Sequence, residues 1–297
     1  MVTRRCDNQT FYLRPDPVVN QIILYEVAKA AEAKGTSIHA LIAMSNHLHI
    51  GLTDPKGSLS DFMCEAIGGI SKAMNRYLGR KGLFWEPEKF GETKLLDEEA
   101  IERFVNYIWL NPVKANLVEK AEEWPGLRIG PEMWGRTLEV KKPEKVYGRK
   151  SKDVAKIKFT PPPCYEDMNL EEAIQEMKDL IALEEKRYAM QRQQEGKKVV
   201  GAAAVKKINP FYTPEKTNAN DKPCSMFAGD DELVEAAKKD YKDFVDRYRA
   251  KRERWVKGIL RTDERFPCGT VWLRRYAGVK CEPPPDEKQN LAPPETG

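Results

Sequence analysis

Two histidines separated by one residue are the part of this chain best suited to chemistry. His47 and His49 flank Leu48, and the chain has three histidines in all. In a strand, residues i and i+2 point to the same face, so both imidazoles can bind one divalent metal ion. Two side chains hold a metal weakly, so further ligands are needed. The same spacing also fits two ordinary polar residues on a half-exposed strand, and it leaves both interpretations open.

A tyrosine and an amide follow in a segment with helical spacing of its apolar residues. Tyr107 and Asn111 are four residues apart, which places them on one helix face. A tyrosine hydroxyl near a metal ion bound by two histidines is suited to nucleophilic attack on a phosphodiester. The pattern also fits a packed tyrosine with a hydrogen-bonded hydroxyl, and an asparagine that ends a helix before Pro112.

Strands and helices alternate around these residues. The residue patterns predict four strands and three helices: strands at 9–14, 37–44, 47–53 and 92–95, and helices at 18–34, 58–78 and 97–110. The order β-α-β-β-α-β, followed by one more helix, is that of the split βαβ, ferredoxin-like arrangement of the α+β class. Right-handed crossovers place the first two helices on one sheet face, which leaves the other face for a substrate and the third helix.

The composition changes after the first 125 residues. We expect residues 1–125 to form the domain that carries the histidines, and residues 126–165, rich in Lys and Pro, to form a linker. Residues 166–281 are expected to form a mainly α-helical C-terminal region, whose role the sequence leaves open. The Pro- and Glu-rich residues 282–297 are expected to be a disordered tail.

Charge and cysteine content set limits on the class of protein. The 297 residues carry a formal net charge of +4, which is compatible with nucleic acid binding without requiring it. The six cysteines include no CxxC pair, which argues against a disulfide framework or a zinc ribbon. There is no secretory signal and no apolar run of roughly 20 residues, so we expect a soluble cytoplasmic protein with no membrane partner.

Three motifs, taken in order, resemble those of the REP-associated tyrosine transposases. These are single-tyrosine HUH transposases (HUH stands for His, hydrophobic, His), which act on single-stranded DNA. The resemblance runs from about residue 4 to residue 124. The motifs are Ser45-Asn46-His47-Leu48-His49-Ile50, Asn106-Tyr107-Ile108-Trp109-Leu110-Asn111-Pro112-Val113-Lys114-Ala115 and Glu123-Trp124-Pro125.

The resemblance implies a function and a role for each matched residue. His47 and His49 would ligate Mg²⁺ or Mn²⁺, and Tyr107 would be the nucleophile that forms a 5′-phosphotyrosine and frees a 3′-hydroxyl. Asn111 would be a third ligand, at a place where many relatives carry Gln. The chain would then be a transposase that nicks and joins single-stranded or hairpin-forming DNA, as a monomer or a homodimer. Asn116 stands where relatives often have Gly, and both residues tolerate a left-handed backbone.

Contacts to DNA are expected from basic and aromatic residues in and after the second predicted helix. Arg and Lys bind phosphates, and aromatic rings stack on unpaired bases. An equally good interpretation is a solvated loop with Phe84 and Trp85 packed beneath it. The candidate DNA-binding residues are Arg76, Tyr77, Arg80 and Lys81, together with Arg4 and Arg5 near the N-terminus.

Two other functions fit the same residues. One is a domesticated relative that binds hairpin DNA without cutting it. The other is a metal-dependent hydrolase that uses His47 and His49 with water as the nucleophile. The general base is not identified by the sequence, since the remaining histidine, His39, is better explained as a hydrogen-bonded structural residue.

Overall fold

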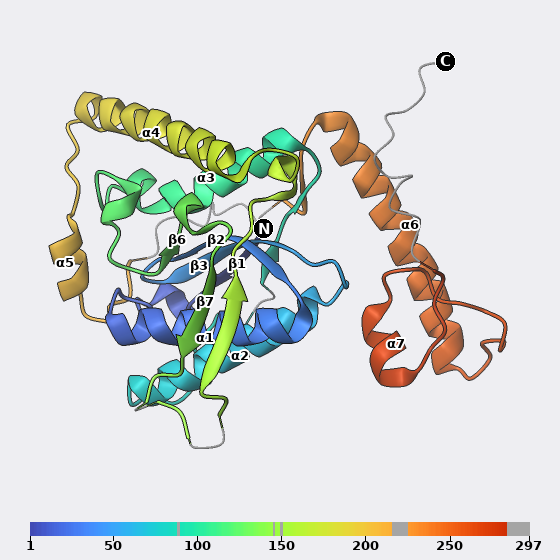
Figure 1. Cartoon of the computed structure of the whole chain (residues 1–297). Coiled ribbons are helices and arrows are strands. Elements are labelled where there is room, and N and C mark those ends of the chain that lie inside the picture. Colours follow the sequence, from blue (N-terminus) through green and yellow to red (C-terminus); the bar gives the residue numbers. More distant parts are fainter. Residues whose placement is uncertain (88–89, 145, 149–150, 216–224, 284–297) are drawn as a thin grey trace, which may run out of the picture. The chain divides into compact units, whose positions relative to one another are not determined.

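The computed structural model describes residues 1–87, 90–144, 146–148, 151–215 and 225–283 (Figure 1). The chain divides into two compact units, Met1–Gly229 and Asp230–Gly297. Of the predicted disordered tail, residues 284–297 lie outside the described residues. Among the described helices, none combines the length and apolar character needed to cross a bilayer.

The first unit is built on a five-stranded sheet with the strand order β4-β1-β3-β2-β6. All four neighbouring pairs in this sheet are antiparallel. The order therefore interleaves strands that are distant in sequence, with β1 lying between β3 and β4. The strands are β1 (Val2–Arg5), β2 (Ser37–Ala43), β3 (His47–Thr53), β4 (Gly91–Glu92) and β6 (Arg128–Ile129).

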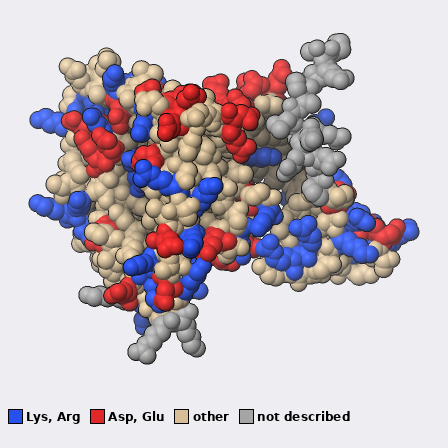
Figure 2. Space-filling model, in the orientation of Figure 1, with Lys and Arg blue, Asp and Glu red and all other residues tan. Residues whose placement is uncertain are grey.

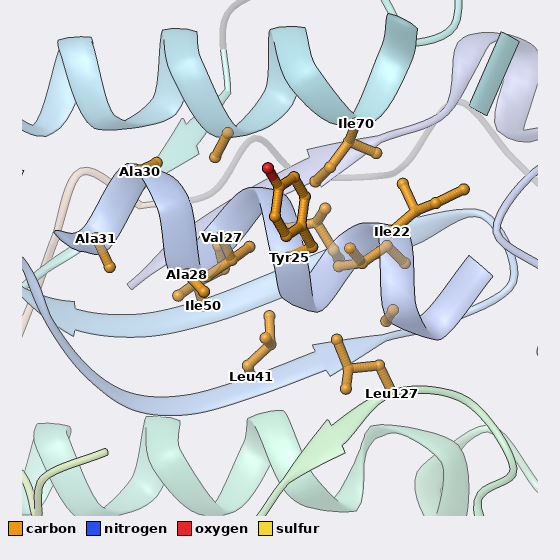
Figure 3. Close-up of a cluster of buried hydrophobic side chains, with 14 of the residues drawn as sticks. Ile22, Tyr25, Val27, Ala28, Ala30, Ala31, Leu41, Ile50, Ile70 and Leu127 are labelled. Atoms are coloured by element: carbon orange, nitrogen blue, oxygen red, sulfur yellow. The ribbon is translucent and has the colours of Figure 1, made fainter. Parts of the chain in front are cut away.

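Two helices, α1 (Pro17–Lys34) and α2 (Leu59–Tyr77), cover one face of this sheet. The Asp16 side chain caps α1 by accepting hydrogen bonds from the backbone of Val18 and Val19. Apolar residues of both helices pack on alternate residues of the strands and form one buried cluster (Figure 3). The labelled members of that cluster are Ile22, Tyr25, Val27, Ala28, Ala30, Ala31, Leu41, Ile50, Ile70 and Leu127.

The opposite face of the sheet is covered by α3 (Glu98–Lys114), on which α4 (Leu170–Gln194) packs. Asp97 caps α3, and buried Ile108 and Trp109 pack against the strand residues that point to this side. The predicted end of the helix at residue 110 is too early, because Pro112 lies inside it. A proline removes one backbone N–H, and the helix still closes with a hydrogen bond from the Ala115 N–H to the carbonyl of Asn111.

The first predicted strand, at residues 9–14, is wrong. The strand at this end of the chain is β1, and Asp7–Gln9 form a short 3-10 helix instead. Asn8 and Gln9 have φ angles of 51° and 55°, which no strand can contain. The apolar residues just after them misled the prediction, whereas β1 itself reads as polar and carries little signal of its own.

The predicted linker at residues 126–165 is part of the first unit. It supplies β6 to the sheet and an antiparallel hairpin of β7 (Thr137–Lys141) and β8 (Val154–Lys158). Ala155 and Ile157 alternate with exposed lysines and are buried against α1. This hairpin has the alternation of a half-buried strand pair, which the Lys and Pro content of the region concealed.

The predicted mainly helical region is divided between the two units. α4, α5 (Ala202–Lys207) and β9 (Phe227–Ala228) belong to the first unit, where β9 pairs in parallel with β5 (Lys94–Leu95). The second unit contains α6 (Asp231–Val256) and α7 (Val271–Ala277), and Phe266 and Leu273 are buried within it.

Candidate active site

The two histidines of β3 face α3. Side chains alternate along the strand, and Leu48 is fully buried on the side of α1 and α2. His47 and His49 therefore point to the other face, with their ring centroids 4.8 Å apart. The pairing with β1 sets Thr3 opposite His49 and Arg5 opposite His47, on that same face.

The middle of α3 brings the tyrosine and the amide to these rings. The ring centroid of Tyr107 lies 5.4 Å from that of His49, with the planes at 76°. One turn later, the side-chain nitrogen of Asn111 lies 3.2 Å from Nε2 of His49. His49 and Asn111 are buried, whereas His47 and Tyr107 are half-buried. Four residues that the sequence singled out are thus brought together from β3 and α3.

Hydrogen bonds fix which nitrogen of His49 carries its proton. The Asn111 amide nitrogen only donates, so Nε2 of His49 accepts and bears the lone pair. The proton of the neutral ring is then on Nδ1, which lies 2.7 Å from the Thr3 hydroxyl and donates to it. Burial, followed by the charges of His47 and Arg5, holds the pKa of His49 well below its usual value. The ring is therefore neutral at pH 7, with its lone pair directed at α3.

A neighbouring amide orients His47 in the same way. The Asn46 side-chain oxygen lies 2.7 Å from Nδ1 of His47. A carbonyl oxygen only accepts, so Nδ1 donates the proton and Nε2 of the neutral ring carries the lone pair. Metal-binding imidazoles are commonly held by such a hydrogen bond from the ring nitrogen that does not bind the metal.

Tyr107 lies beside a cation that the sequence pattern did not single out. Nζ of Lys114, seven residues later and two turns along α3, lies 5.1 Å from the centroid of the Tyr107 ring. Phe104 contacts the ring from the preceding turn, with centroids 6.4 Å apart. The ring is thus held by neighbours before and after it on the same helix.

The side chains that could hold a metal here are His47, His49 and Asn111. The described part of the chain contains no group of three His, Cys, Asp or Glu residues suited to a metal ion. Among the described residues, the side chain beside the two imidazoles that offers a further ligand atom is the amide of Asn111. An amide ligates through its oxygen, whereas the nitrogen of Asn111 faces His49 here.

Two of the candidate DNA-binding residues, Arg76 and Tyr77, lie at the end of α2, which covers the opposite sheet face, and Arg80 and Lys81 lie in the loop after it. Three of them make contacts within the protein. Arg76 donates to the carbonyl of Val146, and the Tyr77 hydroxyl donates to Asp16. Arg80 donates to Asn75 and Leu83, while Lys81 is exposed.

The loop after α2 is packed rather than loose. Arg80 lies over the Tyr12 ring at 4.1 Å and bonds the Leu83 carbonyl at 2.6 Å. Phe84 and Trp85 are buried, with the Trp85 ring N–H donating to the Ile67 carbonyl. Of the two interpretations that the sequence left open here, the structure agrees with the one in which Phe84 and Trp85 are packed beneath the loop.

The two N-terminal arginines point to different faces of the sheet. Arg5 pairs with His47 and shares its face, so it lies on the side of the candidate site. Arg4 pairs with Leu48 and donates to the Glu86 carbonyl at 2.6 Å. Arg5 is thus the arginine of this pair that strand alternation directs to the histidines.

The third histidine has a structural environment. His39 is buried, with Nδ1 3.0 Å from the Thr160 carbonyl and Nε2 2.9 Å from the Thr53 hydroxyl. Burial lowers its pKa to about 4. Both ring nitrogens are occupied by structural partners, as the sequence interpretation favoured.

Three residues of the site were missed from the sequence. Thr3 becomes visible only once β1 is placed beside β3. Asn46 stands next to His47 and was quoted as part of the first motif without a role of its own. Lys114 could have been found, because residues seven apart share a helix face.

The sequence of this chain is similar to that of a known transposase. A search against models of protein families finds no match. A REP-associated tyrosine transposase of Escherichia coli (strain K12) is 27% identical over 105 residues. The predicted resemblance is confirmed. The match covers 35% of this chain, and the chain spans 61% of the relative's length.

A solved structure also resembles this chain. It is described as a REP-associated tyrosine transposase bound to a REP hairpin, and it is 21% identical. The match covers 42% of this chain and 72% of the other, with a TM-score of 0.35. At that level of similarity we draw no conclusion from it about fold or function.

Proposed function

We propose that this chain is a transposase that cleaves and rejoins single-stranded DNA through Tyr107. The observation that carries the proposal is the meeting of Tyr107 and Asn111 of α3 with His47 and His49 of β3. The similarity to a REP-associated tyrosine transposase supports the same function. Single-stranded or hairpin-forming DNA is the proposed substrate.

The reaction of Tyr107 is a displacement at phosphorus. The phenolic oxygen forms a bond to the phosphorus while the bond from phosphorus to the 3′ oxygen breaks. The phenol loses its proton, and the leaving oxygen gains one to become a free 3′-hydroxyl. The 5′-phosphotyrosine keeps the energy of the phosphodiester, so attack by a 3′-hydroxyl in reverse rejoins DNA without ATP.

The cofactor of this proposal is a divalent metal, Mg²⁺ or Mn²⁺, held by His47, His49 and Asn111. The two imidazole lone pairs fit such an ion, and a softer Mn²⁺ accepts nitrogen ligands more readily than Mg²⁺. When bound, the metal supplies a positive charge for the phosphate oxygens. Thr3 and Asn46 hold the two rings in the orientation that this requires.

The fold of the first unit supports the proposal. We interpret the antiparallel order β4-β1-β3-β2, with α1 and α2 on one face, as a ferredoxin-like HUH domain. In that arrangement the strand that bears both histidines is central, and α3 packs on the sheet face that α1 and α2 leave free. A rigid sheet and one helix then position all four side chains.

A covalent adduct tests the proposed function. The purified protein, incubated with Mn²⁺ and a hairpin oligonucleotide with a single-stranded flank, is expected to gain the mass of a DNA fragment. Tyr107→Phe keeps the ring and its packing but lacks the nucleophile, so it is expected to form no adduct. Tyr188→Phe, on α4, is the matched control and is expected to form the adduct as the unaltered chain does.

Each other outcome selects a different function. An adduct that persists in Tyr107→Phe would refute the assigned nucleophile. Binding of the hairpin without cleavage under either metal would favour the domesticated DNA-binding protein. Metal-dependent cleavage that leaves no DNA on the protein would favour a hydrolase that uses water.

A further inference from the structure

The second unit combines a strong positive charge with exposed aromatic side chains. Residues 247–280 contain eleven Lys or Arg and three Asp or Glu. Trp272 and Tyr276 of α7 are 65% and 61% exposed. Figure 2 shows Lys and Arg grouped on the visible face of this unit. We propose that this surface of α6 and α7, called here the Arg-Trp surface, binds single-stranded DNA.

The charge of α6 is divided along its length. Its N-terminal part, from Asp231 to Asp246, is acidic, and the basic part begins at Arg247. A helix dipole favours bases in the last turn alone, so it accounts for Arg254 and not for Arg249 or Arg252. The positive charge also continues beyond the helix. The helix dipole therefore does not explain the positive charge of this region.

The few acids of the basic part are already paired. Glu264 bonds Lys251 at 2.9 Å and Arg254 at 2.6 Å, and Glu253 bonds Lys257. Arg261 and Asp263 pair at 3.2 Å. Among the described residues, Arg249, Arg252 and Arg274 form no ion pair with an acid. These three guanidinium groups are exposed and are available for phosphates.

The aromatic pair of α7 has the geometry of a stacking platform. Trp272 and Tyr276 are one turn apart, with ring centroids 5.4 Å apart and planes at 43°. Leu273 faces inward and is buried, so α7 is fixed by Leu273 and presents its rings outward. Unpaired bases stack on exposed, neighbouring rings of this kind.

The type of cation favours nucleic acid over a lipid surface. Eight of the eleven basic residues between 247 and 280 are Arg. Guanidinium forms paired hydrogen bonds with phosphates and stacks on bases. A membrane-binding helix needs in addition a large continuous apolar face, and α6 and α7 have a single buried residue, Leu273, between them. The choice of DNA as the nucleic acid rests on the proposed function, since the first unit would act on single-stranded DNA.

Photocrosslinking locates the DNA on the protein. The full chain carrying Tyr107→Phe is mixed with an oligothymidylate in which iodinated uracil replaces some bases, and is irradiated. A stacked base crosslinks to the ring beneath it, so peptide mass spectrometry is expected to find DNA on Trp272 or Tyr276. Crosslinks found exclusively in residues 1–229 would overturn the proposal.

Binding measurements test the rings and the charges separately. Trp272→Ala with Tyr276→Ala is expected to weaken oligothymidylate binding by about tenfold or more, because the bases lose the rings on which they stack. Tyr241 is an exposed ring in the acidic part of α6. Tyr241→Ala is therefore the matched control and is expected to leave the affinity for oligothymidylate unchanged. Equal affinity of the double variant and the unaltered chain would overturn the proposal.

The salt dependence gives the readout for the phosphates. Arg249→Gln with Arg252→Gln is expected to lower the slope of log K against log salt by about 0.7 for each phosphate that is no longer bound. Lys238→Gln, a paired lysine of the acidic part, is expected to leave the slope unchanged. Binding to phosphatidylserine vesicles with no binding to oligothymidylate would show a membrane surface instead and would refute the proposal.

The two proposals can fail independently. The crosslink uses a chain that has lost its nucleophile, so it does not depend on cleavage. An adduct on Tyr107 without a crosslink in the second unit would refute the Arg-Trp surface alone. A crosslink at Trp272 without any adduct would refute the proposed reaction alone.

Discussion

Asn111 donates its side-chain N–H to the lone pair of His49 that a metal would need, across 3.2 Å. The contact joins the middle of α3 to the centre of the sheet, and both residues are buried. It holds the amide beside the imidazole pair, one turn from Tyr107. The same residue is thus a partner of His49 in the present structure and the proposed third ligand.

Replacing Asn111 tests that second role. Asn111→Leu has similar volume and no oxygen, so we expect the affinity for Mn²⁺ to fall about 10–100-fold, as it does when metal-site partners are removed. Titration calorimetry with Mn²⁺ measures this without DNA. Asn111→Gln keeps an amide oxygen and is expected to retain most of the affinity. If Asn111→Leu bound Mn²⁺ as tightly as the unaltered chain, Asn111 would not be a ligand.

Thr3 is expected to act through His49. Thr3→Val keeps the shape of the side chain but removes the hydroxyl that accepts the Nδ1 proton at 2.7 Å. The ring then loses the hydrogen bond that fixes its lone pair toward α3, so we expect Mn²⁺ to bind about tenfold more weakly. Thr3→Ser restores the hydroxyl and should restore binding. Equal weakening in both variants would point to packing of the methyl group instead.

Substituting alanine for the two adjacent glycines of α2, Gly68 and Gly69, is expected to change the free energy of unfolding in opposite directions. A Cβ at Gly69 would overlap the carboxylate of Glu26, which is 1% exposed and paired with Lys29, so that carboxylate cannot move aside freely. A Cβ at Gly68 would meet no atom within 4 Å. In urea unfolding, we expect Gly69→Ala to destabilise by about 1–3 kcal/mol.

Gly68→Ala is the matched control for that prediction. Alanine favours a helix interior over glycine by about 1 kcal/mol, so this variant should be slightly more stable than the unaltered chain. Stabilisation by both variants would show that Glu26 yields to the added methyl group.

His39 is expected to make the fold sensitive to acid. Its pKa is about 4 in the folded chain, against an ordinary value of 6.5, so the unfolded chain binds the proton first as pH falls. Its contribution to stability is therefore complete above pH 6.5 and is lost between pH 6.5 and 4, by roughly 3 kcal/mol. Urea unfolding across this pH range measures the loss.

A variant without the imidazole isolates that contribution. His39→Gln is expected to be less stable at neutral pH, because the bonds to Thr53 and Thr160 are altered. Its stability should nevertheless fall less between pH 6.5 and 4. An equal fall in both chains would assign the acid sensitivity to other groups.

Much of the first unit follows from local sequence patterns. The strand with His47 and His49 was predicted with the bounds that the structure has, since its apolar residues alternate regularly. The predicted starts of α1 and α3 lie within one residue of the observed ones, where Asp16 and Asp97 cap the helices through local hydrogen bonds. Asn116 does adopt the left-handed backbone expected of it, with φ of 55°.

Other elements depend on partners that are distant in the chain. β1 has four mostly polar residues, and its position between β3 and β4 comes from hydrogen bonds to those strands. The hairpin of β7 and β8 is stabilised by burial against α1, more than a hundred residues earlier. Local composition does not encode such pairings, so the sequence interpretation placed a strand at 9–14 and a linker at 126–165.

The sequence by itself determined which residue types could react and on which elements they lie: two imidazoles on one strand face, and a phenol and an amide on one helix face. It could not determine that these faces meet, because a period of two or of 3.6 defines a face without its partner. The tertiary structure decided this by packing α3 on the sheet face opposite α1 and α2. It also supplied Thr3, which orients the His49 ring, since hydrogen bonds across strands depend on register.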